Sequence, residues 1–470
     1  MTDLAVAAFA VFHLALREVI LVIAIGIALS GLDDLFIDLL FFARTLWRRI
    51  RIYSRHSRAT TESLRSLWPA PMAILVPAWD EAAVIGAMLR DLLARIDYPD
   101  YRVFVGLYPN DPAGAAAVAA VADARITAIT CARPGPTTKA DCLNQLWDAV
   151  VAHETARRMV FKAIVLHDAE DVVHAQELWI FDALIPRLAM VQLPVLPLPD
   201  PGSRWISGHY ADEFAENHAK DMVVREALGA AVPSAGVACG IDRRVIGAIA
   251  STGAPFDAAC LTEDYELGHR IKALGGRGAL VRIRSRDERV VVATREHFPA
   301  SFDAAVRQKA RWLTGIGLSG WDRVGWPRGW ADRYMLLRDR KAILAALLTL
   351  AAYAAGALML VDMLAVDALE ATIPVALPPL LTPALTALLW GNAALLAWRV
   401  VLRAGFTTHA YGAAEGVRAV PRTLASNAIN AAAAIAALRR YRVSLRSGMP
   451  PAWDKTVHRF PASPNGQHAG

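Results

Sequence analysis

Acidic residues in the first half of the chain have the types and spacing of a site for a cation or a ligand rich in hydrogen-bond donors. They fall in three short clusters: Asp80 and Glu81; Asp111; and Asp168, Glu170 and Asp171. Carboxylates in a tight Asp-x-Glu/Asp turn suit hard ions such as Mg²⁺ or Mn²⁺, which keep open positions for substrate phosphates. Solvated loop acids are an alternative for each cluster taken alone.

Two later motifs add further polar groups. Glu263 and Asp264 stand at the start of a predicted helix, where first-turn acids alone would also explain them. Gln308, Arg311 and Trp312 are spaced i, i+3 and i+4, so they share one helix face. An amide, a guanidinium and an indole on one face could clamp a diphosphate and stack on a sugar. A helix whose long side chains snorkel at a membrane interface would give the same pattern.

The elements that position these residues alternate between strand and helix patterns. Strands are predicted at residues 73–77, 101–107, 125–130 and 163–167, with helices at 81–95, 114–123 and 139–153. Such alternation predicts an α/β domain built on a mainly parallel sheet covered on both faces. Ligands of these sheets bind outside the carboxyl ends of the strands. The three acidic clusters follow strands, so we expect them at one edge of the sheet.

Apolar runs flank this domain. Residues 4–42 contain one expected membrane span followed by an arginine-rich segment, and the uncharged runs 342–361 and 371–398 are each long enough for another. Residues 423–438 are expected to form an interfacial helix, with a further span as the alternative. The predicted organisation is a transmembrane helix (1–42), a basic juxtamembrane linker (43–71), a catalytic domain (72–333), a transmembrane pair (334–405), and an interfacial helix with a cytoplasmic tail (406–470).

Composition supports this mixed organisation. Of 470 residues, 55% are hydrophobic and 20% charged, too apolar for a wholly soluble chain and too charged for one confined to lipid. The net charge of +6 is small, and the basic residues lie beside apolar runs. This favours a membrane surface over nucleic acid as a partner. Four cysteines without a Cys-x-x-Cys pair argue against a disulfide scaffold or a cysteine zinc site.

Together the motifs resemble the membrane-bound family 2 glycosyltransferases, the group of cellulose, chitin and hyaluronan synthases. All five motifs of that family occur in its order between Pro77 and Trp312. The resemblance implies a Rossmann-like GT-A domain in the cytoplasm, a nucleotide-sugar donor such as a UDP-sugar, and a Mg²⁺ or Mn²⁺ cofactor.

Other segments are similar to a narrower group, the inner-membrane glycosyltransferases called bacteriophage adsorption protein B. They are residues 108–112, 132–144, 167–171, 233–237 and 453–456, so the resemblance covers nearly the whole chain. Longer members of this group carry a C-terminal regulatory domain that binds a cyclic dinucleotide. A chain that stops at Gly470 is expected to lack that domain.

The resemblance assigns donor-binding roles to the first motifs. Asp80, Glu81 and Asp111 would face the base and ribose of the nucleotide, and Lys139 would lie near it. The chain departs from the family pattern at Asp80, where asparagine is commoner.

The resemblance also assigns the chemical roles. Asp168 and Glu170 would take the positions of the metal-binding Asp-x-Asp turn, with Asp171 as a competing ligand. Glu170 is longer than the usual second aspartate, which changes the expected metal geometry. Asp264, with Glu263 beside it, would be the catalytic base. Gln308, Arg311 and Trp312 would hold the diphosphate and the acceptor end.

These roles imply one reaction. A cation would neutralise the leaving diphosphate, a base would deprotonate the acceptor hydroxyl, and a single in-line displacement would invert the anomeric centre. We expect a multi-pass bacterial inner-membrane enzyme that uses UDP-N-acetylhexosamine or UDP-hexose to build or extend a cell-surface glycan or exopolysaccharide. Its acceptor would be a glycan or a lipid-linked sugar, with room for an outer-membrane export partner. The alternatives are transfer of one sugar to a lipid carrier and a non-catalytic membrane scaffold for phage adsorption.

Overall fold

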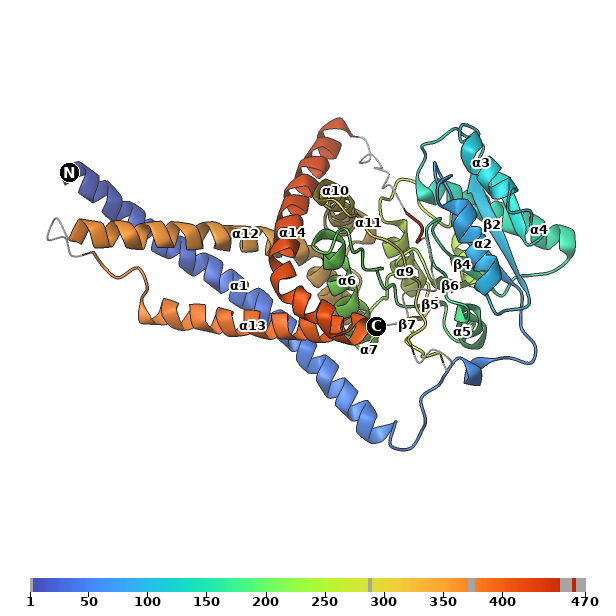
Figure 1. Ribbon diagram of the computed structural model, residues 1–470, viewed down its shortest axis with the longest axis horizontal. Helices are drawn as coiled ribbons and strands as arrows, with labels where there is room; N and C mark the ends of the chain where they lie inside the picture. Colours follow the sequence, from blue (N-terminus) through green and yellow to red (C-terminus); the bar gives the residue numbers. More distant parts are fainter. Residues whose placement is uncertain (1–2, 286–289, 371–376, 449–458, 462–470) are drawn as a thin grey trace.

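The computed structural model describes residues 3–285, 290–370, 377–448 and 459–461. Its two regions are a globular part and a stalk of long helices (Figure 1). The stalk consists of α1 (Asp3–Arg51), α12 (Trp330–Glu370) and α13 (Pro383–Tyr411), so it brings together the beginning and the end of the chain. We call these three helices the stalk throughout.

A seven-stranded sheet forms the centre of the globular part, in the order β3-β2-β1-β4-β6-β5-β7. All its strands run in one direction except β6, which is antiparallel to β4 and β5. The four predicted strands are confirmed to within one residue at each end, and the sheet is mainly parallel as expected. The bounds are β1 (Met72–Pro77), β2 (Tyr101–Leu107), β3 (Ile126–Thr130), β4 (Ala163–Leu166), β5 (Met190–Gln192), β6 (Cys239–Asp242) and β7 (Gly278–Leu280).

Strand β1 shows how the two faces of the sheet are covered. Met72, Ile74 and Val76 belong to the core cluster that includes helix α2 (Ile85–Arg95). Ala73 and Leu75, which point the other way, belong to the cluster that includes α4 (Lys139–Arg157). Every residue of β1 from Met72 to Val76 is fully buried, as expected for a central strand between two helical layers. The remaining helices around the sheet are α3 (Pro112–Ala119), α5 (Glu177–Leu184) and α8 (Arg243–Ala250).

Two helices begin at other residues than predicted, and both differences have local causes. Helix α2 starts at Ile85 instead of residue 81, because Asp80 adopts a positive φ of 53° and the chain turns before the helix. Helix α3 starts at Pro112 instead of residue 114, because Asp111 is its N-cap and accepts a hydrogen bond from the Gly114 amide.

A layer of helices lies between the sheet and the stalk (Figure 1). Two of its segments are short π-helices. The layer comprises α6 (Ile206–Glu216), η2 (Asn217–Asp221), α7 (Met222–Ala227), α9 (Glu263–Ala273), α10 (Phe302–Trp312), η3 (Leu313–Ser319), α11 (Gly320–Val324) and α14 (Ala413–Ser447). A 3₁₀ turn, η1 (Glu62–Leu64), precedes the sheet.

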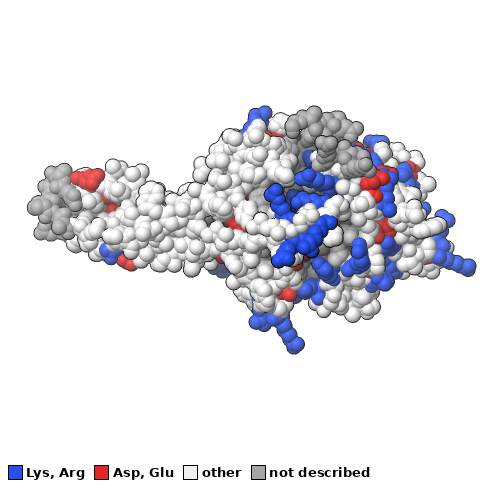
Figure 2. All heavy atoms as spheres, turned by 90° about the horizontal axis from the view of Figure 1, so that it is seen from below, with Lys and Arg blue, Asp and Glu red and all other residues white. Residues whose placement is uncertain are grey.

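Within the described residues, the three stalk helices are long and apolar enough to cross a membrane. Large apolar side chains face outward along them, including Val22 (67% exposed), Leu360 (60%) and Trp390 (73%). Figure 2 shows few charged side chains on the stalk, whereas Lys and Arg gather over a hollow of the globular part. Part of the predicted run 371–398 lies outside the described residues, and α13 begins with Pro383 in its first turn.

Ion pairs join the stalk helices where they meet the globular part. Asp34 of α1 pairs with Arg338 of α12 at 3.0 Å and with Arg399 of α13 at 3.4 Å. Lys220 of η2 is fully buried and pairs with Asp38 of α1 at 2.5 Å. The charged residues of the stalk base are thus matched by opposite charges, so the three helices and the globular part share one polar junction.

Candidate active site

A cavity of about 390 Å³ opens beyond the carboxyl ends of β1, β2 and β4, toward α9 and α10. It brings together nine of the twelve predicted site residues from five separate segments. They are Glu81, Lys139, Asp168, Glu170, Glu263, Asp264, Gln308, Arg311 and Trp312. The other three, Asp80, Asp111 and Asp171, do not line it.

Asp171 lies behind the turn of Asp168 and Glu170, to which the resemblance assigns metal binding. Its Oδ2 accepts a hydrogen bond from the Asp168 amide at 3.1 Å and lies 2.6 Å from His167 Nδ1. The other ring nitrogen of His167 lies 2.7 Å from Glu177. Burial opposes protonation of this ring, but Glu177 and Asp171 raise the pKa of His167 to about 10. Asp171 is thus paired with an imidazolium and shapes the turn instead of facing the cavity.

Asp80 and Asp111 support the turns that follow β1 and β2 and do not line the cavity. Asp111 accepts hydrogen bonds from the amides of Asp80 and Gly114, both at 2.9 Å. Above them two aromatic residues that the sequence did not single out line the cavity: Trp79 packs edge-on against Tyr108, with ring centroids 5.0 Å apart. These rings offer an apolar wall for a planar base.

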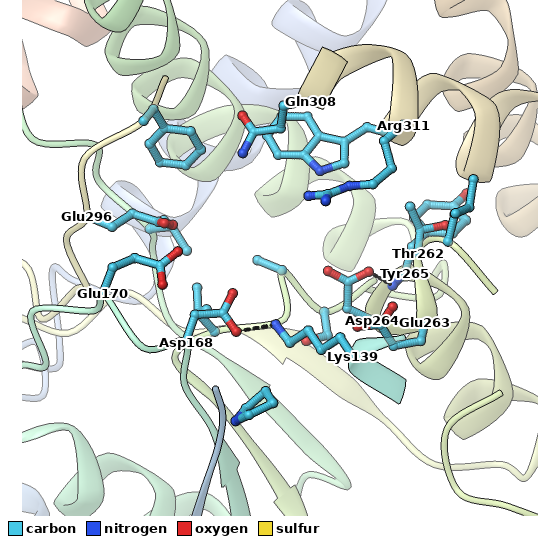
Figure 3. Close-up of a pocket in the computed structure, with 18 of the residues that line it drawn as sticks. Lys139, Asp168, Glu170, Thr262, Glu263, Asp264, Tyr265, Glu296, Gln308 and Arg311 are labelled. Atoms are coloured by element: carbon cyan, nitrogen blue, oxygen red, sulfur yellow. Dashed lines mark hydrogen bonds and ion pairs between the residues drawn. The ribbon is translucent and has the colours of Figure 1, made fainter. Parts of the chain in front are cut away.

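Lys139 lies between the acids of two different motifs (Figure 3). Its Nζ is 2.5 Å from Asp168 Oδ1 and donates to the Gly236 carbonyl at 3.3 Å. Burial opposes its charge, but the carboxylates of Asp168, Glu263 and Asp264 raise the pKa of Lys139 above its usual value. A Cβ at Gly236 would lie 2.8 Å from Asp264 Oδ2, so only glycine, at φ +78°, allows this convergence.

Glu263 and Asp264 form the first turn of α9. Burial raises the pKa of Asp264, and the positive charges of Lys139 and Arg311 offset part of this rise. Burial and the negative charge of Asp264 raise the pKa of Glu263. An aspartate with a raised pKa in a cavity is suited to accept a proton near neutral pH. The side chain of Thr262, just before this turn, packs against Gly315 of η3, where a Cβ would lie 2.5 Å from its Oγ1.

Helix α10 forms the opposite wall. Figure 3 shows Gln308 and Arg311 extending from it over the acids. Gln308 Oε1 is buried and has no hydrogen-bond partner among the described residues. Trp312 packs with Tyr210, Phe214 and Phe298, with ring centroids 6.1–6.4 Å apart, and also lines the cavity. The wall therefore presents an amide, a guanidinium and an indole on one side of the cavity.

Glu296 is a site residue that the sequence did not reveal, because no motif surrounds it. It lies beside Glu170 in Figure 3 and lines the same cavity. Burial and the charges of Asp171, Glu170 and Asp168 raise the pKa of Glu296 well above its usual value. Carboxylate oxygens such as those of Glu296 and Glu170 are suitable ligands for Mg²⁺ or Mn²⁺. However, in the described part of the chain no three His, Cys, Asp or Glu side chains are assembled to hold a metal ion together.

Comparison with known proteins identifies the family. The family model described as glycosyltransferase like family 2 matches residues 69–315, which include the sheet, the acidic clusters and α10. The chain belongs to this family. It is therefore a glycosyltransferase, and the resemblance found in the motifs is confirmed.

Two curated relatives extend the match beyond this domain. The chain is 37% identical over 479 residues to bacteriophage adsorption protein B of Escherichia coli (strain K12), covering 97% of this chain and 63% of the relative. The bacteriophage N4 adsorption protein B of Escherichia coli O157:H7 gives the same identity and coverage. The chain thus spans less than two thirds of the length of these relatives.

A solved structure shows the same fold. The mannosyltransferase PcManGT from Pyrobaculum calidifontis, in complex with GDP-Man and Mn²⁺, superimposes with a TM-score of 0.51 at 16% identity. The superposition covers 86% of this chain and 99% of PcManGT, more than the globular part alone. The predicted GT-A fold with flanking apolar helices is confirmed.

Proposed function

We propose that this enzyme transfers a hexosyl group from a UDP-sugar, UDP-N-acetylhexosamine or UDP-hexose, to a glycan acceptor with inversion. The observation that carries the proposal is the convergence of Asp168 and Asp264, from distant segments, on one cavity with Lys139 between them. One carboxylate belongs to the turn after β4 and the other to the first turn of α9. A displacement reaction needs the leaving group and the base on separate sides of the reacting carbon.

Asp168 and Glu170 would hold the divalent cation of the donor complex, with Glu296 beside them. When bound, Mg²⁺ or Mn²⁺ would neutralise the negative charge that develops on the diphosphate. The Mn²⁺ and nucleotide sugar bound to PcManGT support this choice of cofactor. Arg311 can make charge-assisted contacts with the same phosphates, and Trp79 with Tyr108 can pack on the base.

Asp264 is the proposed general base. Its carboxylate takes the proton of the acceptor hydroxyl while that oxygen forms a bond to the anomeric carbon. The bond from this carbon to the diphosphate oxygen breaks, and UDP leaves. The raised pKa of Asp264 brings its basicity closer to what a hydroxyl requires near neutral pH. Attack from the face opposite the diphosphate inverts the configuration.

We propose that α1, α12 and α13 cross the bacterial inner membrane and that α14 lies at its cytoplasmic surface. The arginines at the end of α1 support a cytoplasmic position for the globular part. Three apolar helices of sufficient length support the spans. The product would then be a cell-surface glycan, exported with an outer-membrane partner.

Transfer of a single sugar to a lipid carrier is the alternative within the same chemistry. A non-catalytic scaffold for phage adsorption is an alternative of another class, suggested by the names of the curated relatives. The cavity argues against the scaffold, because costly buried carboxylates and a lysine converge there without an evident structural need.

The test is a donor screen with a matched pair of variants. Detergent-purified protein is incubated with a panel of UDP-sugars and Mn²⁺, and release of UDP and incorporation of sugar are measured. Asp264→Asn should lower turnover by about 10²–10⁴-fold while UDP affinity stays within about twofold. Asp148→Asn, at an exposed position of α4, is the control and should match the parent. Turnover of any donor supports the enzyme. Full turnover by Asp264→Asn would refute the base, and no turnover of any donor would favour the scaffold.

A further inference from the structure

A buried pair of ionisable side chains lies at the end of the stalk away from the globular part, where α1 begins and α12 ends (Figure 1). His13 of α1 is 3% exposed and Asp362 of α12 is 1% exposed, and His13 Nδ1 lies 2.8 Å from Asp362 Oδ2. The other ring nitrogen, Nε2, lies 2.8 Å from the carbonyl oxygen of Pro378, in the connection that leads from α12 to α13. We call these three residues the latch, because they join the far ends of the stalk helices.

An apolar layer separates the latch from a hollow part of the stalk. A cavity of about 830 Å³ lies between the stalk helices nearer the globular part, and it extends along α1 as far as Ile27 and along α12 as far as Tyr353. Beyond these residues, apolar side chains of the stalk pack into one buried cluster, which consists of Leu16, Ile20, Ala24, Ala355, Leu380 and Leu385. The latch therefore lies on the outer side of a closed layer.

The hydrogen-bond partners of His13 determine how many protons the latch holds. A carbonyl oxygen only accepts hydrogen bonds, so Nε2 carries a proton and donates it to Pro378. The contact between Nδ1 and Asp362 Oδ2 then needs a second proton. This proton makes either an imidazolium that faces a carboxylate or a neutral imidazole that faces a carboxylic acid, and neither form has a net charge. Without it, a ring lone pair would face a buried carboxylate.

Within the described residues, neighbouring charges do not replace this proton. On α1 the next ionisable residues are Arg17 and Glu18, which pair with each other at 2.9 Å. On α12 the next charged residue is the exposed Asp367, and residues 377–398 of the connection and of α13 contain no ionisable side chain. Asp362 Oδ1 is buried without a hydrogen-bond partner in the same part of the chain. A lone carboxylate is costly inside a membrane, so the closed latch retains its shared proton.

We propose that His13 and Asp362 form a proton-dependent latch that holds the far end of the stalk closed. When the helices separate, both side chains meet water, in which an imidazole is neutral above about pH 7 and a carboxyl group is ionised. Opening therefore releases one proton to the water and leaves a neutral ring and a carboxylate. Because the closed state binds one proton more than the open state, its stability relative to the open state falls by about tenfold per pH unit above pH 7.

The position of the latch determines which solution it responds to. His13 precedes Asp34 of the polar junction by 21 residues, which is roughly 31 Å of helix and close to the thickness of the hydrocarbon. In the proposed membrane arrangement, the latch therefore meets the solution on the side opposite to the active site. A rise in pH on that side weakens the closed end of the stalk. This inference goes beyond the transferase function and does not depend on it.

Amide hydrogen exchange of the full chain in lipid nanodiscs tests the proposal, because exchange detects an open state even when its population is small. Rates are corrected for the intrinsic pH dependence of exchange. In the parent, the protection of amides in residues 9–20 should fall by about tenfold per pH unit between about pH 7 and pH 9. Residues 30–40, at the other end of the same helix, are the internal reference and should change by less than about twofold.

Asp362→Asn separates the proton from the latch. Its amide can donate to Nδ1 of a neutral His13 while Nε2 still donates to Pro378, so protection should persist and stay within about twofold from pH 7 to pH 9. Asp362→Leu removes the latch, so protection at pH 7 should be about tenfold lower than in the parent and independent of pH. Glu18→Gln, whose side chain is 60% exposed on the same helix, is the control and should keep the pH dependence of the parent.

Three outcomes would overturn the proposal. They are a parent whose protection is the same at both pH values, an Asp362→Asn variant that loses protection with pH as the parent does, and an Asp362→Leu variant that matches the parent at pH 7. A cooperative thermal unfolding transition shows that each variant is folded. Exchange is measured without donor or acceptor, so the result stands whether or not the chain turns over any of the UDP-sugars.

Discussion

The donor side and the acceptor side of the cavity are held in different ways. On the donor side, Glu81 and Asp168 follow central strands, so the backbone ladder of the sheet fixes them. On the proposed acceptor side, Asp264 is carried by α9, which belongs to the helical layer next to the stalk. The first side follows the ends of central strands, whereas the second is positioned by contacts between helices.

Those contacts reach the stalk directly. Tyr265, next to the proposed base, donates a hydrogen bond to Asp339 of α12 at 2.6 Å, and Arg225 pairs with the same carboxylate at 2.8 Å. Gly315 of η3 packs on Thr262, at the other end of the same turn. The geometry of the proposed base is therefore coupled to the position of a stalk helix, whereas the turn that carries Asp168 follows strand β4. Variants on the two sides should fail in different ways.

The largest effect is expected at the donor turn. Asp168→Asn removes a proposed cation ligand and the partner of Lys139, so Mn²⁺-dependent UDP binding and turnover should both fall by roughly 10³-fold. Asp171→Asn, behind the turn, should cost only about 10–100-fold, since it acts through orientation. The UDP affinity of each variant is measured by titration with and without Mn²⁺, and turnover is measured alongside. Equal losses in the two variants would contradict the separate roles assigned to these carboxylates.

A smaller loss of a different kind is expected at the stalk. Asp339→Asn weakens the contacts of Tyr265 and Arg225, so kcat should fall by about tenfold while UDP affinity is retained. Tyr265→Phe removes the hydrogen bond to Asp339 alone, so kcat should fall by less than in Asp339→Asn. Steady-state kinetics with donor and acceptor varied separately provide the readout. A fall in UDP affinity as large as the fall in kcat would show that the two sides are not independent.

Gly315→Ala tests the packing of η3 on the base turn. The new Cβ would overlap Thr262, so we expect a loss of about 1–3 kcal/mol in the free energy of unfolding and a several-fold fall in kcat. Gly317→Ala is the matched control, because its Cβ would lie 3.1 Å from the Ile343 Cδ1 methyl, which can move. Thermal unfolding and kcat are measured together. Equal effects at both glycines would exclude a specific role for the Thr262 contact.

The smallest effect is expected at Arg323, which joins α11 to Glu266 of α9 and to Asp257. The arginine is 24% exposed and Asp257 43% exposed, so solvent screens the pairs and each contributes at most about 1 kcal/mol. Arg323→Gln should lower kcat two- to threefold, with a larger difference from the parent at low salt than at high salt. A salt-independent loss would indicate a packing role for this side chain.

The strand pattern predicted where the acids gather but not which of them face the cavity. Buried strands such as residues 101–107 have continuous apolar runs, and the acids that follow them must lie at one edge of a parallel sheet. All five predicted residues of α9 and α10 line the cavity, whereas only four of the other seven do. Asp111 and Asp171 support the turns from behind instead, which their sequence positions do not distinguish from facing the cavity.

Glu296 and the Tyr265–Asp339 contact were not predicted because both depend on tertiary packing across long sequence separations. Glu296 reaches Glu170 only through short bridges of its segment to residues near 172 and 195. No local pattern encodes such positions, so a single sequence does not reveal them.

The length of α1 has a consequence for how the enzyme works at a bilayer. Its 49 residues extend roughly 73 Å, more than twice the roughly 30 Å of hydrocarbon that a span must cross. The chain enters the globular part from the far end of this helix and leaves it through α12, at a separate point (Figure 1). Ion pairs join α12 and α13 to α1 at the polar junction, so the globular part is not held by a single tether. In the proposed membrane arrangement, each round of synthesis would therefore take place at a constant height above the lipid headgroups.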